Sequence, residues 1–147
     1  MLSKSSKYAV RAVLYLASNK ICKKCSSKEI ASTLEIPAPF LAKTLQKLAK
    51  EKIISSTKGP NGGFFLTDKD KSNSILDIIE CIDGLEKFKE CFLGHPDCND
   101  VHPCVVHHIV APFKTELLDT LSSKTILDFS IEILSNPNSK LFKIINS

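Results

Sequence analysis

Residues 36–67 read IPAPFLAKTLQKLAKEKIISSTKGPNGGFFLT, and this stretch decides the fold that the sequence predicts. Pro39 suits the first turn of a helix, which we expect to run to about Glu51. Apolar side chains repeat in this helix at i, i+4 and i+7 and predict a buried stripe: Leu41, Leu45 and Leu48. Basic side chains repeat at the same spacing two residues later, about 200° around the helix, and therefore point away from the core: Lys43, Lys47 and Lys50.

A second helix precedes this one across a short turn. Ser26 and Glu29 have the spacing of a capping box, which predicts a helix over residues 27–34. Residues 35–38 form a tight turn, and residues 4–18 carry apolar side chains at the spacing of a first helix. Two helices joined by a tight turn, the second with an outward basic face, are the layout of a helix-turn-helix. The alternative is an ordinary amphipathic helix whose lysines face solvent.

The segment after the third helix predicts a β-hairpin. Residues 52–57 contain a β-branched pair, residues 58–63 read KGPNGG, and residues 64–67 return as a second strand. A hairpin directly after a recognition-type helix is a wing. Its tip carries Lys58, Asn61 and bare glycine backbone, which can approach phosphates or enter a minor groove. A plain hairpin is the alternative, but the order of the elements and their charge favour the wing.

Composition and charge narrow the class of protein. Of the 147 residues, 43% are apolar and 24% charged, which excludes a wholly disordered chain. The longest apolar run, residues 12–17, is far shorter than the roughly 20 residues of a membrane helix, so we expect a soluble, cytoplasmic protein with no membrane partner. Residues 1–70 carry 13 Lys and Arg against 5 Asp and Glu, whereas the rest of the chain carries 7 against 11. A basic half with net charge +8 joined to an acidic half of −4 indicates that the first half meets a polyanion such as nucleic acid.

Three of the six cysteines gather in one loop. A short helix over residues 75–83 ends at Gly84, and the following stretch to Cys104 has little apolar periodicity. Three soft ligands on a flexible loop suit an iron–sulfur cluster or a tetrahedral zinc ion: Cys91, Cys98 and Cys104. The lack of a C-x2-C pair in this loop modestly favours the cluster over zinc, and unligated cysteines are the alternative to both. His107 lies three residues after Cys104 and can turn toward the same site in a helix; the weaker candidates are His95, His102 and His108.

The remaining cysteines indicate no second site. Cys22 and Cys25 form a lone C-x2-C after the first helix, and Cys81 lies among apolar neighbours, where we expect it in the core. A cysteine-dependent enzyme needs a thiolate paired with a base in a pocket, and nothing in the order of residues points to one. We therefore predict a protein that is not an enzyme. Zinc binding or a thiol redox switch in the loop is the nearer alternative to a cluster.

Beyond the cysteine loop, apolar residues return at helical spacing. Pro112 lies inside this stretch and should kink or restart the helix. The helix is more apolar than a small domain needs on its surface, so we predict a two-fold interface along one stripe: Val106, Ile109, Val110, Phe113 and Leu117. A last short helix is expected over residues 125–134, followed by a frayed tail.

Taken in order, four motifs resemble the Rrf-type winged-helix regulators, which include the iron–sulfur cluster regulator IscR and the nitric-oxide-sensing repressor NsrR. Residues 3–17, SKSSKYAVRAVLYLA, are similar to the first helix of that family. Residues 36–48 resemble its recognition helix, and residues 57–64, TKGPNGGF, its wing. The three loop cysteines lie where the cluster-binding members carry three. The likeness covers roughly residues 1–130.

The resemblance implies a mainly helical homodimer with a small β-hairpin wing, bound to a palindromic operator in double-stranded DNA. It divides the chain into a winged helix-turn-helix over residues 1–83, a cluster-binding loop over 84–104, and a dimerisation helix with tail over 105–147. His107 matches the fourth ligand of the IscR branch. The NsrR branch instead uses an aspartate of the partner's first helix, where this chain has Ser6, Lys7 and Tyr8. The first two cysteines are also separated by six residues here and by five in the well-known members.

The expected regulator, a repressor or dual regulator, uses its helical face and wing on DNA and its loop on a cluster. We place at base edges the outward residues of the third helix: Pro39, Phe40, Lys43 and Thr44. Lys47 and Lys50 are assigned to phosphates, and Lys58 and Asn61 to the wing tip. For the cofactor, a 2Fe–2S cluster is slightly favoured over 4Fe–4S.

Overall fold

α1 (Lys4–Ser18) lies at the centre of the fold in the computed structural model, which describes residues 2–20 and 23–147. Ser3 caps the helix by accepting a hydrogen bond from the Ser6 backbone N–H. α1 packs against α3, α5 and α8, and its small apolar residues let those helices approach it closely. The residues that the sequence placed on its inner face are all buried: Ala9, Ala12, Val13 and Leu16.

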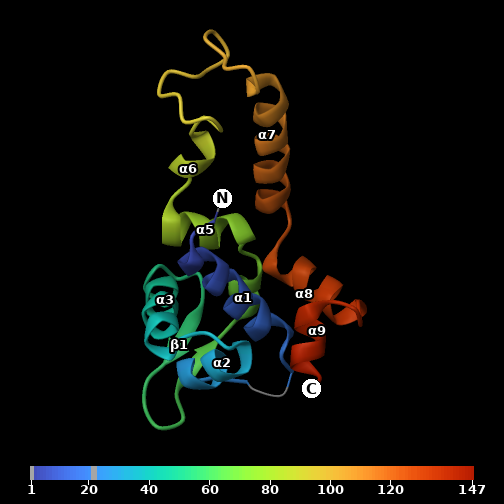
Figure 1. Cartoon of the computed structure of the whole chain (residues 1–147). Coiled ribbons are helices and arrows are strands. Elements are labelled where there is room, and N and C mark those ends of the chain that lie inside the picture. The colour runs from blue at the N-terminus through green and yellow to red at the C-terminus, as the bar shows by residue number, and fades with distance from the viewer. Residues whose placement is uncertain (1, 21–22) are drawn as a thin grey trace.

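α2 (Ser27–Leu34) and α3 (Ala38–Lys50) form the expected helix-turn-helix beside α1 (Figure 1). The capping box is present, with Ser26 and Glu29 each satisfying the other's backbone N–H. Glu35 takes a left-handed conformation, φ 55°, and makes the turn tight. The Arg11 guanidinium donates to the carbonyl of Leu34 at 2.9 Å and ties this turn to α1. The α3 stripe is fully buried: Leu41, Leu45 and Leu48.

The wing consists of β1 (Ser55–Thr57) paired antiparallel with β2 (Gly63–Phe65). Both strands are shorter than the sequence predicts. Ile53 and Ile54 precede β1, because the Ile53 N–H closes the end of α3 on the carbonyl of Leu48 at 2.9 Å and Ile54 enters the core. Cys25 pairs with Phe64 through two backbone hydrogen bonds, so the loop before α2 lies against the wing. Only glycine fits at Gly63, since a Cβ there would meet the Cys25 backbone at 2.8 Å.

The second half is entirely helical between its loops. Two short helices that the sequence analysis did not foresee are α4 (Asp68–Lys71), capped by Thr67, and α6 (Glu86–Lys89), inside the supposed loop. α5 (Ile75–Asp83) ends at Gly84 as predicted. α7 (His107–Ser123) and the cysteine loop project together from the winged-helix unit (Figure 1). A small apolar cluster joins them to that unit: Ile75, Ile79 and Phe88, packed by Leu117, Leu118, Leu121 and Phe129.

One expectation about the second half is wrong and another is corrected in part. Pro112 does not restart the helix, since α7 runs through it from His107 to Ser123. Pro112 lies in the second turn, where a proline removes a single hydrogen bond, the one to the carbonyl of His108, an exposed residue. The tail is not frayed either. After α8 (Ile126–Ser135), α9 (Lys140–Ile145) packs three apolar side chains against the main core: Leu141, Ile144 and Ile145.

Across residues 2–20 and 23–147, the structure has no helix that is both long and apolar enough to cross a bilayer.

Candidate metal centre and nucleic-acid interface

The outer surface of α3 carries most of the residues that the sequence assigned to DNA. Pro39, Lys43, Lys47 and Lys50 are exposed, as the helical spacing requires. Lys47 Nζ also donates to the carbonyl of Ile82 at 3.5 Å, which places this side chain on the flank of α3 that faces the end of α5. Lys58 and Asn61 are exposed at the wing tip. The structure therefore places these six polar or outward residues on surfaces open to a duplex.

Phe40 and Thr44, which the sequence also assigned to base edges, make contacts within the protomer. Phe40 is partly covered because its ring meets Tyr8 of α1 edge-on, with centroids 5.5 Å apart. Thr44 is 7% exposed, and its hydroxyl donates to the carbonyl of Phe40 at 3.0 Å. A side chain buried and bonded in this way is not presented to a base edge, so the placement of Thr44 there is wrong. The sequence did not predict the contact of Tyr8 with Phe40, because the spacing of residues within α3 does not show which side chains of α1 lie beside them.

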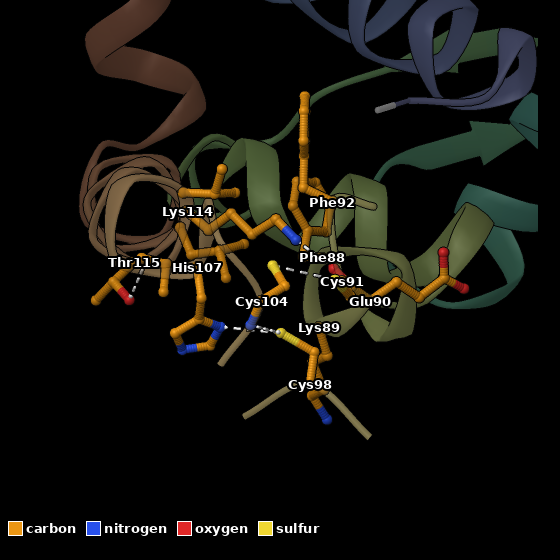
Figure 2. Close-up of a pocket in the computed structure, with 13 residues that line it drawn as sticks. Phe88, Lys89, Glu90, Cys91, Phe92, Cys98, Cys104, His107, Lys114 and Thr115 are labelled. Atoms are coloured by element: carbon orange, nitrogen blue, oxygen red, sulfur yellow. Dashed lines mark hydrogen bonds between the residues drawn. The ribbon is translucent and has the colours of Figure 1, made fainter. Parts of the chain in front are cut away.

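The cysteine loop brings its three thiols together at the start of α7. Their Sγ atoms all lie within 4.8 Å of one another, although the residues span positions 91 to 104. Cys91 Sγ and Cys104 Sγ are 3.7 Å apart, and the Cys104 backbone N–H donates to Cys98 Sγ at 3.4 Å. In Figure 2 the sulfur atoms of Cys98 and Cys104 lie beside α7, and a dashed line joins the Cys104 sulfur to Cys91. The loop therefore folds into a donor cluster rather than dispersing its cysteines.

His107, the first residue of α7, lies beside one thiol of this cluster. Its Nδ1 lies 3.3 Å from Cys98 Sγ (Figure 2), and its Nε2 lies 2.9 Å from a carboxylate oxygen of Asp100. The sequence analysis missed Asp100, although a carboxylate two residues after a candidate ligand is a visible signal. The other loop histidines are exposed, in agreement with their weaker standing: His95, His102 and His108.

The thiols differ in their electrostatic surroundings. Desolvation works to raise the pKa of Cys91, but backbone N–H groups of His95 and Leu93 and the neighbouring thiols donate to it and lower its pKa to about 6. The Cys104 N–H lowers the pKa of Cys98, yet desolvation and the adjoining sulfurs outweigh that donation and raise it. One thiol therefore ionises readily next to another that resists ionisation, which is the pattern of donors crowded into one site.

A hollow of about 250 Å³ adjoins the thiols. Its walls come from α6, the cysteine loop and α7, and apolar side chains line its inner end: Phe88, Val110, Ala111 and Leu118. Lys114 reaches across it from α7 and donates to the carbonyl of Glu90, just before Cys91 (Figure 2). The loop therefore contacts α7 at Glu90, just before Cys91, and again at Cys98, which lies beside His107.

The remaining cysteines lie elsewhere. Cys25 is buried beside the wing, and Cys22 lies outside the described residues. Cys81 packs against the core but is half-buried, less covered than expected, and desolvation raises its pKa.

α7 also carries the apolar stripe that the sequence assigned to a two-fold interface. None of its seventeen residues is buried, and Ile109 and Phe113 are 74% and 57% exposed. The stripe is not uniform, however. Val110 turns toward the hollow beside the thiols, and Leu117 packs on the α5 cluster. The outward part of the stripe therefore centres on Ile109 and Phe113.

Comparison with known proteins places these features in a family. The model of the Rrf2 family, described as iron-dependent transcriptional regulator, matches residues 2–131. An HTH-type transcriptional regulator of Aquifex aeolicus is 36% identical over 130 residues, covering 87% of this chain and 90% of that protein. Protein rrf2 of Nitratidesulfovibrio vulgaris is 27% identical over 127 residues, covering 86% of this chain and 85% of that protein.

Solved structures share the fold. CymR, the global cysteine regulator of B. subtilis, superposes with a TM-score of 0.70 at 20% identity and covers 90% of this chain and 97% of its own. IscR of T. potens superposes with a TM-score of 0.66 at 23% identity and covers 90% and 87%. The winged-helix prediction is confirmed by these neighbours. The expectation of a regulator rather than an enzyme is confirmed by the family and its members.

Proposed function

Since this chain belongs to the Rrf2 family of transcriptional regulators, we propose that it is a homodimeric, sequence-specific DNA-binding regulator whose affinity for a palindromic operator changes with an iron–sulfur cluster. The cluster ligands are Cys91, Cys98, Cys104 and His107. One observation carries this proposal: three thiols of one loop converge beside α7, and His107 Nδ1 lies 3.3 Å from one of them, Cys98 Sγ. The three-part division of the chain at residues 83 and 104 belongs to the same proposal.

The donor set fits such a group chemically. Thiolates and imidazole are the ligands of iron–sulfur centres, and the family's description as iron-dependent agrees with that chemistry. Cys91 Sγ lies 3.7 Å from Cys104 Sγ and His107 Nδ1 lies 3.3 Å from Cys98 Sγ, within a cluster whose three sulfur atoms are all within 4.8 Å of one another. We propose a 2Fe–2S cluster, slightly favoured over 4Fe–4S, for these donors.

Zinc is the second candidate for the same donors. A tetrahedral ion with Zn–S bonds of about 2.3 Å places its sulfur ligands about 3.8 Å apart. The 3.7 Å between Cys91 and Cys104 Sγ agrees with that separation. The same pair, with the pKa of Cys91 near 6, also suits a thiol switch that closes a disulfide. Iron, sulfide and zinc contents separate these three cases.

On DNA, we assign affinity to the exposed lysines and selectivity to the start of α3. Lys47, Lys50 and Lys58 neutralise phosphates, and Asn61 and the glycine backbone bring the wing close to the duplex. Lys43 donates to a guanine edge, while Pro39 and Phe40 pack on apolar base groups such as a thymine methyl. Tyr8 packs edge-on against the Phe40 ring and supports it from α1.

The link between the two sites runs through α7. A bound cluster would cross-link the loop to the first residue of α7, and its gain, loss or oxidation would supply the signal. In this chain Lys114 fastens Glu90 to α7, and Leu117 and Leu118 fasten α7 to α5. Pairing of two α7 helices through Ile109 and Phe113 sets the separation of the two α3 helices. Operator binding depends on that separation, so ordering the loop can change affinity by roughly 5–150-fold.

Anaerobic purification tests the proposal. We expect a brown protein with visible absorption and with iron and acid-labile sulfide in equal amounts. Holo and apo forms are then compared on one operator at one salt concentration. Equal affinities would end the sensor proposal while leaving DNA binding intact. A colourless protein with one zinc per chain would replace the cluster by the second candidate.

A further inference from the structure

We propose that Asp100 is a positioning residue for His107: it holds the imidazole so that Nδ1 faces Cys98 Sγ, one of the three clustered thiols. This inference rests on the proposed function, because there His107 is the fourth ligand. The residue concerned lies in the cysteine loop but is not itself one of the four donors. Its effect on the site is exerted through the His107 ring.

The two hydrogen bonds of the His107 ring carry the argument. Asp100 Oδ1 lies 2.9 Å from Nε2, and Cys98 Sγ lies 3.3 Å from Nδ1. An ionised carboxylate can only accept, so Nε2 must carry the proton in this contact. The neutral ring then has its lone pair on Nδ1, the atom turned toward the sulfur cluster. Asp100 therefore selects the tautomer and the orientation in which Nδ1 binds a metal.

The fold of the loop keeps Asp100 in this place. Asn99 Oδ1 accepts backbone N–H groups of Val101 at 2.8 Å and His102 at 2.9 Å. The Asn99 N–H in turn donates to the carbonyl of His102 at 3.3 Å. These bonds close residues 99–102 into a turn from which Asp100 reaches back to α7. The His107 side chain is 16% exposed while that of Asp100 is 97% exposed, so the carboxylate approaches the mostly buried ring from the solvent side.

The chemistry of such a contact is general. A carboxylate that accepts from the outer nitrogen of a metal-bound histidine fixes the ring and makes the inner nitrogen more basic. Its negative charge also favours the more oxidised, more positive state of a redox-active group nearby. Loss of Asp100 should therefore weaken metal binding, and loss of its charge alone should move the reduction potential of the cluster upward.

Three variants separate these effects. Asp100→Ala removes the hydrogen bond and the charge, whereas Asp100→Asn keeps an oxygen that accepts from Nε2–H and removes only the charge. Asp97→Asn is the matched control, because it removes a carboxylate exposed on the same loop and three residues away. The probes are cobalt(II) titrated into anaerobic, reduced apo protein, and the reduction potential of the cluster-loaded protein. Cobalt absorption reports coordination by thiolate and imidazole directly.

For Asp100→Ala we expect cobalt affinity to fall 10–100-fold. The cobalt affinity of Asp100→Asn should lie between that variant and the wild type, and its reduction potential should rise. Asp97→Asn should leave the cobalt affinity unchanged and move the potential less than Asp100→Asn does. In a His107→Ala background, Asp100→Ala should have no further effect on cobalt affinity, because Asp100 acts on that affinity only through the ring. Cobalt affinity within two-fold of wild type in Asp100→Ala, or an equal loss in both backgrounds, would overturn the inference.

The outcome is distinct from that of the proposed function. A wild-type protein without iron or sulfide, but with cobalt binding that depends on Asp100, would refute the cluster and leave the positioning role standing. A chain that binds neither cluster nor cobalt would overturn both.

Discussion

Phe113→Asp should convert the proposed dimer into a monomer. Phe113 lies on α7 with 57% of its surface exposed, beside Ile109 at 74%, and it belongs to neither core cluster of the protomer. With roughly 200 Å² on a phenylalanine side chain, about 110 Å² of Phe113 is open to a partner. Burial of that area at about 25 cal/mol per Å² stabilises the dimer by about 3 kcal/mol per subunit. Because the dimer is two-fold symmetric, each subunit contributes this free energy once.

Partial burial of Phe113 in the interface still predicts a large effect on the dissociation constant of the dimer. If the interface covers half of the open area, the loss is about 3 kcal/mol per dimer, which is roughly a hundred-fold in the dissociation constant. An aspartate adds the cost of desolvating a charge and of bringing it near its symmetry mate. We therefore expect a monomer at micromolar concentration. Sedimentation equilibrium measures this directly.

The control uses the same helix and the same charge. Ser122→Asp lies nine residues further along α7, about 180° around the helix from Phe113, and Ser122 is exposed. It should sediment as a dimer like the wild type. Circular dichroism should show that both variants keep their helices and unfold at similar temperatures. A Phe113→Asp protein that dimerises with unchanged affinity would place the interface elsewhere and refute this reasoning.

Three further predictions concern the loop, the DNA surface and the base of α1. Substitution of Cys91, Cys98 or Cys104 by Ala should in each case abolish a stable cluster. His107→Ala should leave a labile cluster, and Cys25→Ala should leave the visible absorption spectrum unchanged. A cluster that survives the loss of a loop cysteine would mean that the wrong ligands are named. Lys47→Ala should lower the slope of log K against log salt by about one per protomer on all sequences, and Lys43→Ala should relax preference at one base pair by roughly 1–3 kcal/mol; wild-type binding by both would argue against the α3 surface. Desolvation works to raise the pKa of Asp83, but the hydrogen bond that the Ser3 hydroxyl donates to its carboxylate at 2.6 Å outweighs this effect and lowers the pKa. This hydrogen bond therefore stabilises the fold above the pKa of Asp83, and the stabilisation is lost as the pH falls through that pKa. Ser3→Ala should move the Asp83 carboxyl titration, followed by carbon NMR, to higher pH; an unmoved titration would show that Ser3 is not the cause.

Local chemistry explains why the first half could be read from the sequence. The capping box of Ser26 and Glu29 and the Leu41, Leu45 and Leu48 stripe act within one or two turns of helix, so spacing alone determines them. The glycine-rich turn of the wing is equally local. Three cysteines in a short loop indicate a metal site by composition alone, and their convergence agrees with that reading.

Contacts between segments far apart in the chain determined features that sequence spacing did not predict. Ile54 leaves the expected strand because the core beside α3 has room for it, and α9 forms because Leu141, Ile144 and Ile145 find that core. Thr44 is a different case, because it lies three residues after Leu41 and four before Leu48, so helical spacing by itself places it beside the buried stripe.

The site shows the same division. Sequence spacing placed His107 near Cys104, but only the folded loop brings Asp100 to the far side of the ring and sets Cys98 Sγ beside Nδ1. Periodicity determines which residues share a face of one helix. It does not determine which face of another element they meet, because that depends on packing between segments far apart in the chain.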